Sequence, residues 1–187
     1  MRGHEVIAEA AAAGFSRVGG VFRRGHGADA LQLYVAASVD PRQNEGYPGW
    51  DVVDPDGALD RHAWVELSCR SRVLTSNFLL RDRASWLAWG SGLASRVGDR
   101  KFARRFHLHG PPTVETLAPF TANVRRALLG VPRCGGFQVF ASRLDEWDHA
   151  SFGANWPLRK APGGLVSTVA EALEMIGNAG RAVPYRA

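Results

Sequence analysis

The chain has 187 residues, 45% hydrophobic and 22% charged, a length and composition typical of one globular domain. No stretch approaches the roughly 20 consecutive apolar residues that span a bilayer, so we expect no membrane segment. The formal charge is +5, but all except two of the 23 basic residues are arginine. This skew is typical of a GC-rich bacterial genome, so the arginine count alone does not indicate phosphate binding.

The beginning of the chain predicts one helix followed by a hairpin. Gly3–Gly14 has apolar residues at helical spacing, and Glu5 and Glu9 interrupt its alanine run. These acids favour an amphipathic helix over a signal peptide, so we expect a cytoplasmic protein. Phe15–Arg24 predicts a hairpin, because the paired glycines at its centre supply the positive φ that a tight turn requires.

Two apolar runs, Ala30–Val39 and Ala63–Leu74, alternate with period two. Side chains alternate across a strand, so this pattern is typical of strands with one buried face. We expect Leu33 and Val65 to lie on that buried face. The two runs are predicted to be neighbouring strands of one antiparallel sheet, and Ser76–Leu80 to continue it.

The segment 40–61 between the two runs is predicted to be a long irregular loop, since it contains three prolines and several glycines. Loops of this length in compact domains are usually functional or flexible. Its aromatic residues Tyr47 and Trp50 have two interpretations. They anchor the loop to the core, or they contact a partner, as aromatic residues often do at interfaces.

The second half of the chain predicts mostly helices. Helical spacing or capping residues indicate helices at Arg83–Val97, at Thr113–Leu129 (continuous from Pro119), and at a capping box formed by Thr168 and Glu171. Gly136–Ser142 alternates as a late strand, and Leu144–Pro162 is expected to be irregular.

These elements together predict an α+β fold in one domain over residues 1–187. The expected architecture is an antiparallel β-sheet of about four to five strands packed against three to four helices.

The densest basic stretch is Arg100–His109, in which Phe102 and Phe106 are interleaved with basic residues. If this stretch is helical, its basic residues share one face and its two phenylalanines another. One interpretation is a surface for phosphates or for an acidic partner; the other is an amphipathic helix end with solvated arginines. The candidate partner-binding residues are Tyr47, Trp50, Arg100, Lys101, Arg104 and Arg105.

A metal or catalytic role has weaker support. Asp145, Glu146, Asp148 and His149 lie together, and carboxylates and histidines can bind a cation, but they have no known metal-site spacing. A solvated turn is the alternative. No phosphate-binding loop and no nucleophile elbow is present, so we expect no catalytic residue, no metal and no cofactor.

The two cysteines have different predicted environments. Cys69 is expected on the apolar face of a strand. Cys134 lies between Arg133 and Gly135, and it is either structural or, if exposed near a base, reactive.

Parts of the chain resemble a family of small bacterial α+β domains of unknown function. The resemblance lies in the helix ending at Gly14-Phe15, the strands Val18–Arg23 and Leu31–Val39, the closing helix Val169–Ile176, and the tail Val183-Pro184-Tyr185. Some members of that family are suspected immunity proteins or partners in toxin systems. The resemblance implies a protein-binding role and assigns no catalytic residue.

The leading functional prediction is therefore a non-enzymatic bacterial binding protein, possibly of the immunity type, that acts through a protein–protein interface. One alternative is a nucleic-acid-binding protein or nuclease that uses the basic stretch 100–109. The other alternative is a structural component of a phage or another assembly.

Overall fold

The computed structural model describes residues 3–18, 21–26, 30–36, 64–71, 74, 76–83, 92–143, 150–158 and 161–181. Eight strands lie within these ranges: β1 (Ser16–Val18), β2 (Val21–Arg24), β3 (Leu31–Ala36), β4 (Trp64–Ser71), β5 (Phe78–Asp82), β6 (Phe106–His109), β7 (Gln138–Arg143) and β8 (Ala150–Pro157). The helices are α1 (Gly3–Ala12), the 3-10 helix η1 (Leu93–Val97), α2 (Arg100–Arg105), α3 (Val114–Leu117), α4 (Ala122–Gly130) and α5 (Leu165–Arg181).

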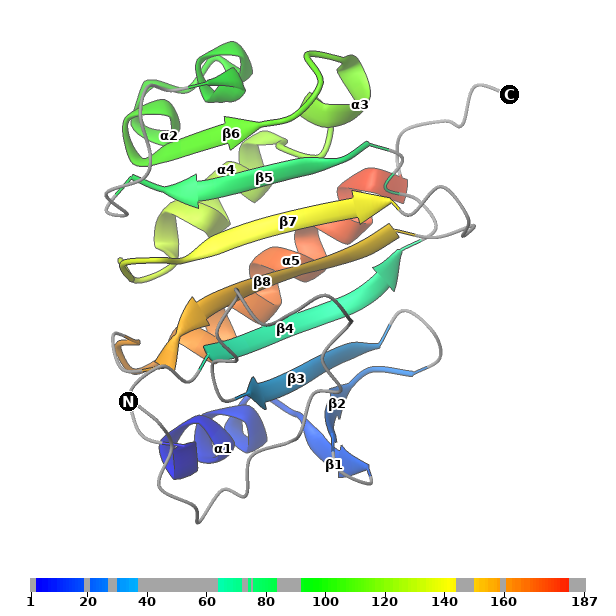
Figure 1. Ribbon diagram of the computed structural model, residues 1–187, viewed down its shortest axis with the longest axis vertical. Helices are drawn as coiled ribbons and strands as arrows, with labels where there is room; N and C mark the ends of the chain where they lie inside the picture. Colours follow the sequence, from blue (N-terminus) through cyan, green and yellow to red (C-terminus); the bar gives the residue numbers. More distant parts are fainter. Residues whose placement is uncertain are drawn as a thin grey trace, which may run out of the picture.

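The strands form one antiparallel sheet in the order β1-β2-β3-β4-β8-β7-β5-β6 (Figure 1). The predicted α+β class is compatible with this architecture. The predicted size was wrong, because the sheet has eight strands where four to five were expected, and five α-helices accompany it where three to four were expected.

The two long apolar runs are neighbouring strands, as predicted. β3 pairs antiparallel with β4, and the register places Leu33 opposite Leu67 and Val35 opposite Val65. Leu33, Val65 and Leu67 are all buried. The predicted amphipathic helix and hairpin at the start of the chain are also confirmed, as α1 and the β1–β2 pair.

One face of the sheet carries the hydrophobic core and is covered by helices. Figure 1 shows α4 and α5 behind the strands. The buried side chains of this face form a band across the central strands, made of Val65 and Leu67 (β4), Phe152, Ala154 and Trp156 (β8), Val139 and Ala141 (β7), and Phe78 and Leu80 (β5). We call it the covered face.

The expectation that Leu144–Pro162 is irregular was wrong, because it contains β8, a central strand paired with both β4 and β7. Glycine, asparagine and proline are depleted in strands, and their presence here hid the alternation of Phe152, Ala154 and Trp156. Gly153 is required by packing. A Cβ atom there would overlap the carbonyl oxygen of Leu67 and the Cα of Ser68 on the adjacent strand.

The predicted capping box was also wrong. α5 begins at Leu165, so Thr168 lies inside the first turn, where its hydroxyl donates to the carbonyls of Gly164 and Leu165. The helix is capped by Glu9 of α1, whose carboxylate accepts hydrogen bonds from the backbone N–H groups of Gly164 and Val166. A carboxylate at a helix N-terminus is favourable because it satisfies free N–H groups and complements the helix dipole.

The predicted helices in the middle of the chain are shorter than expected. Residues 84–91 of the expected Arg83–Val97 helix lie outside the described residues, and its described end is the 3-10 helix η1. The expected Thr113–Leu129 helix is divided into α3 and α4, each with a threonine N-cap, Thr113 and Thr121. Among the described residues, no helix combines the length and apolar character needed to cross a bilayer.

Candidate functional site

The basic stretch Arg100–His109 is divided between two elements, which separates residues that the sequence placed together. α2 ends at Arg105, and Phe106–His109 form β6 at the edge of the sheet. Phe102 and Phe106 are fully buried, with ring centroids 5.0 Å apart. The two aromatic rings are therefore part of the core and are not available to stack on a ligand.

Arg105 is structurally distinct from the other candidate basic residues. Arg105 is only 7% exposed, and its Nε lies 3.0 Å from Oδ2 of Asp82, which is 1% exposed. Its Nη1 donates to the carbonyl of Leu129 at 2.8 Å, and its guanidinium lies 4.8 Å from the centre of the Phe106 ring. Arg105 thus joins α2, β5 and the end of α4 and does not contribute to an exposed surface.

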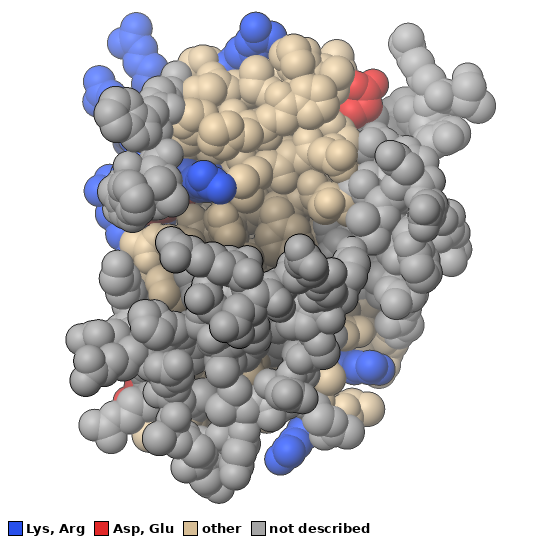
Figure 2. All heavy atoms as spheres, in the orientation of Figure 1, with Lys and Arg blue, Asp and Glu red and all other residues tan. Residues whose placement is uncertain are grey.

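Four basic side chains remain exposed on η1 and α2, namely Arg96, Arg100, Lys101 and Arg104. We call them the basic surface. Figure 2 shows Lys and Arg side chains at the end of the molecule where Figure 1 places α2. Arg100 and Lys101 occupy the first turn of α2, where positive charge opposes the helix dipole. Their positions are therefore not explained by helix stability.

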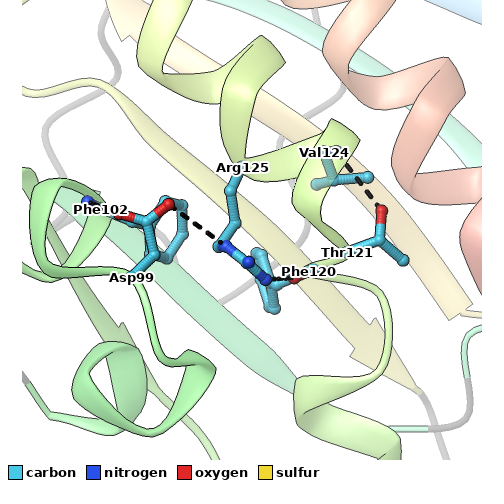
Figure 3. A network of polar contacts seen from close by, with 6 residues as sticks. All are labelled: Asp99, Phe102, Phe120, Thr121, Val124 and Arg125. Carbon is cyan, nitrogen blue, oxygen red and sulfur yellow. Dashed lines mark hydrogen bonds and ion pairs between the residues drawn. The ribbon is translucent and has the colours of Figure 1, made fainter.

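Asp99 is the one acidic residue in the segment 93–105, and it is already engaged (Figure 3). One carboxylate oxygen accepts the backbone N–H of Phe102 at 3.0 Å and caps α2, while the other lies 3.5 Å from Nε of Arg125. The Phe102 N–H, with a smaller contribution from Arg125, holds the pKa of Asp99 below its usual range. The Asp99 carboxylate therefore stays charged, but its negative charge offsets Arg125 more than it offsets the basic surface.

Several other candidates cannot be placed. Tyr47 and Trp50 lie outside the described residues, and so does the acidic cluster at 145–149. Neither cysteine forms a disulfide bond. Cys134 is buried, which removes the exposure that a reactive thiol needs, and Cys69 packs partly buried against the core. Within the described ranges, no group of three or more His, Cys, Asp or Glu residues is arranged to hold a metal ion.

A second candidate surface lies on the sheet face opposite the covered face, which we call the open face. The strand register aligns five polar residues across five neighbouring strands: Glu66 (β4), Asn155 (β8), Gln138 (β7), Arg81 (β5) and His107 (β6). We call this set the polar row. Figure 2 looks onto this face, of which the described surface is visible only in part.

The polar row holds opposite charges apart. Glu66 and Arg81 lie at positions separated by Asn155 and Gln138, so they do not neutralise each other. Burial raises the pKa of Glu66, and a hydrogen bond with Ser68 opposes that rise in part. The Oδ1 atom of Asn155 is buried without a hydrogen-bond partner. A buried acceptor without a partner is costly and uncommon in native structures.

The residues beside the polar row complete its surroundings. The adjacent positions on the open face are Ser68, Gly153, Phe140, Leu79 and His109. The rings of His107 and His109 stack with centroids 3.9 Å apart and planes 9° from parallel. Gly153, next to Asn155 on this face, has no side chain and is itself buried.

Comparisons with known proteins identify no relative, since no family model matches the chain and neither the curated proteins nor the solved structures contain a match.

The sequence did not identify the polar row as a site. Its signal was present only in part, because Glu66 belongs to the polar side of a run whose alternation was recognised. The other members lie on strands that were missed or on strands whose partners were unknown. Alternation shows which face a residue occupies, whereas the pairing of strands decides which residues meet.

Proposed function

We propose that this protein is a non-enzymatic binding protein that docks an acidic protein partner on the basic surface. The observation that supports this proposal is the exposure of Arg96, Arg100, Lys101 and Arg104 in a segment whose single acid, Asp99, is engaged elsewhere. Complementary charge steers association and contributes specificity. Tyr47 and Trp50 remain predicted contacts, and a cytoplasmic, immunity-type role remains a prediction.

A protein partner is favoured over single-stranded nucleic acid because of where the aromatic residues lie. Single-stranded nucleic acid is usually bound by basic grooves together with exposed aromatic rings on which bases stack. Phe102 and Phe106, the aromatic residues interleaved with the basic residues, are buried. The basic surface therefore offers charge and hydrogen-bond donors but no stacking platform of its own.

The test compares two charge-reversal variants by fluorescence anisotropy with labelled poly-L-glutamate. The double variant Arg100→Glu, Arg104→Glu should lose binding, and wild-type binding should weaken as salt increases. The matched control, Arg23→Glu with Arg133→Glu, makes the same change in net charge at exposed arginines outside the basic surface. It should retain most of the binding.

Two outcomes would contradict the proposal. Equal loss in both double variants would show that only net charge matters. Tighter binding to a short DNA duplex than to poly-L-glutamate at the same salt, lost in the Arg100→Glu, Arg104→Glu variant, would favour the nucleic-acid alternative.

A further inference from the structure

At the β5–β6–β7 end of the sheet, apolar side chains occur on the open face as well as on the covered face. Leu79 of β5 and Phe140 of β7 are opposite each other in the strand register, and both are half-buried. A sheet with one packed face usually carries apolar residues toward the core and polar residues toward solvent. Here α4 and α5 lie behind the sheet, and Figure 2 shows described surface where Figure 1 places β5 and β6. Leu79 and Phe140 are thus apolar side chains on the face opposite these helices.

Two aromatic rings belong to this end of the open face. His109 of β6 is opposite Leu79 in the register, so Leu79 separates His109 from Phe140. His109 is exposed, and its ring stacks on the ring of His107 with centroids 3.9 Å apart. The stack holds the His109 imidazole in one orientation before a ligand binds, and this lowers the entropic cost of binding to that ring.

The charged group on this part of the open face is a cation. Arg81 lies two residues after Leu79 on β5, opposite Gln138, and is half-buried. The carboxylate next to it in the chain, Asp82, belongs to the covered face, where it pairs with Arg105. The described open-face positions of β5, β6 and β7 therefore carry a guanidinium and no carboxylate. Such a surface complements an anion, and a planar guanidinium matches the oxygens of a phosphate.

The rings, the apolar surface and the guanidinium together fit a ligand that is flat, aromatic and anionic. Single-stranded nucleic acid has this chemistry, because its bases stack on aromatic side chains and its phosphates attract arginine. Neighbouring strands are about 4.8 Å apart, so the Cα atoms of His109 and Phe140, two strand spacings apart, are separated by about 10 Å. Each ring therefore has room for a base of its own.

We propose that the open face of β5, β6 and β7 is a stacking surface for single-stranded nucleic acid. We call it the stacking face, made of Leu79, Arg81, His109, Gln138 and Phe140. One base stacks on His109 and another on Phe140, while Arg81 binds a phosphate. The Gln138 amide both donates and accepts hydrogen bonds and contacts a base edge. The stacking face is separate from the basic surface on η1 and α2 and does not depend on the protein-docking proposal.

The test measures binding of the full chain to two fluorescein-labelled DNA hexamers by fluorescence anisotropy. One is hexa-deoxyadenylate, and the other is an abasic hexamer with the same phosphates and no bases. Wild-type protein should bind hexa-deoxyadenylate about tenfold or more tightly than the abasic hexamer, because stacking on an aromatic side chain contributes about this factor per base. Attraction between charges alone would give equal binding of the two hexamers.

Variants of the stacking face then separate the contribution of the rings from that of the charge. Phe140→Leu and His109→Ala should each weaken binding of hexa-deoxyadenylate by about tenfold and leave binding of the abasic hexamer unchanged, which also excludes a general loss of fold. His109→Phe should restore binding, because it supplies another ring. Arg81→Gln should weaken binding of both hexamers equally, since a phosphate contact does not depend on the base. Arg23→Gln, an exposed change on β2, should behave as wild type.

Three outcomes would overturn the inference. The first is equal affinity of wild-type protein for the two hexamers. The second is no binding of hexa-deoxyadenylate at submillimolar concentration and low salt. The third is a preference for the hexamer with bases that persists unchanged in both Phe140→Leu and His109→Ala.

Failure of this inference is distinguishable from failure of the proposed docking surface. Phe140→Leu should leave poly-L-glutamate binding intact. The double variant Arg100→Glu, Arg104→Glu, which should lose poly-L-glutamate binding, should keep its preference for hexa-deoxyadenylate over the abasic hexamer.

Discussion

The two faces of the sheet are built from the same strands but carry different kinds of side chains. On the covered face, apolar side chains meet α4 and α5, and the buried charge of Asp82 is paired with Arg105. On the open face, Glu66 and Arg81 are held apart and Asn155 keeps an unpaired acceptor. Buried polar atoms without a hydrogen-bond partner occur on both faces, since Trp156 Nε1 on the covered face is another. The difference lies in the side chains that the two faces carry: apolar residues packed on helices on one, and a row of polar residues on the other.

The largest expected difference between the faces comes from removing one aromatic side chain on each. Trp156 is fully buried on the covered face, so Trp156→Ala should lower the free energy of unfolding by about 4 kcal/mol. Phe140→Ala, on the open face of the neighbouring strand, should cost about 1 kcal/mol or less. Urea unfolding monitored by circular dichroism measures both. Equal losses would show that the open face is also part of the core.

The next effect separates two adjacent arginines. Arg105→Ala leaves the Asp82 carboxylate buried without its partner, so we expect a loss of about 3 kcal/mol. Arg104→Ala, one residue earlier and exposed, should stay within about 0.5 kcal/mol of wild type. The same urea experiment tests both variants. A stable Arg105→Ala protein would mean that Asp82 finds sufficient compensation elsewhere.

A smaller effect is expected at the edge where the basic surface begins. Asp99→Ala removes the N-cap of α2 and the contact with Arg125, which should cost about 1 kcal/mol. Because the folded pKa of Asp99 lies below its usual range, its contribution is present above its unfolded pKa and is lost as pH falls through its folded pKa. Asp99→Asn should keep the cap but lose this acid-dependent part.

The smallest effect on stability is expected on the open face, at Glu66. Its dependence on pH is opposite in sign to that of Asp99. Burial raises the pKa of Glu66, so the folded state keeps this proton at a pH where the unfolded chain has lost it. Stability therefore falls as pH rises from the ordinary glutamate pKa through the folded pKa. Glu66→Gln should be more stable than wild type at neutral pH and no more stable well below the ordinary glutamate pKa. Unfolding midpoints measured across this range, with Glu171→Gln as an exposed control, test the sign.

The sequence predicted the elements that depend on local patterns of residues. The pairing of β3 with β4, the first helix and the first hairpin were all foreseen, because each depends on a strong periodic pattern or a glycine turn. Three features depended on distant residues instead. β8 is a strand because it lies between β4 and β7. α5 is capped by a residue more than 150 positions earlier. Arg105 is buried because it pairs with the buried Asp82.

The candidate sites follow the same division. Arg100, Lys101 and Arg104 were identified as exposed cations from composition and spacing, and their exposure agrees with that expectation. The polar row could not be found in this way, because its five members come from five strands whose order departs from the order of the chain.

The position of β8 has a consequence for how the chain is made. The strands β1 to β4 form one consecutive block and β5 to β7 form another, and within the described residues no strand pairing joins the two blocks directly. Among the described strands, the joining strand β8 is the last in the chain, and α5, which shields the apolar side, follows it. A nascent chain lacking residues beyond 149 would carry two unfinished edges, β4 and β7, that are open to pairing with other chains. Such distant pairings also slow folding, so β8 and α5 complete both the sheet and its protection from aggregation.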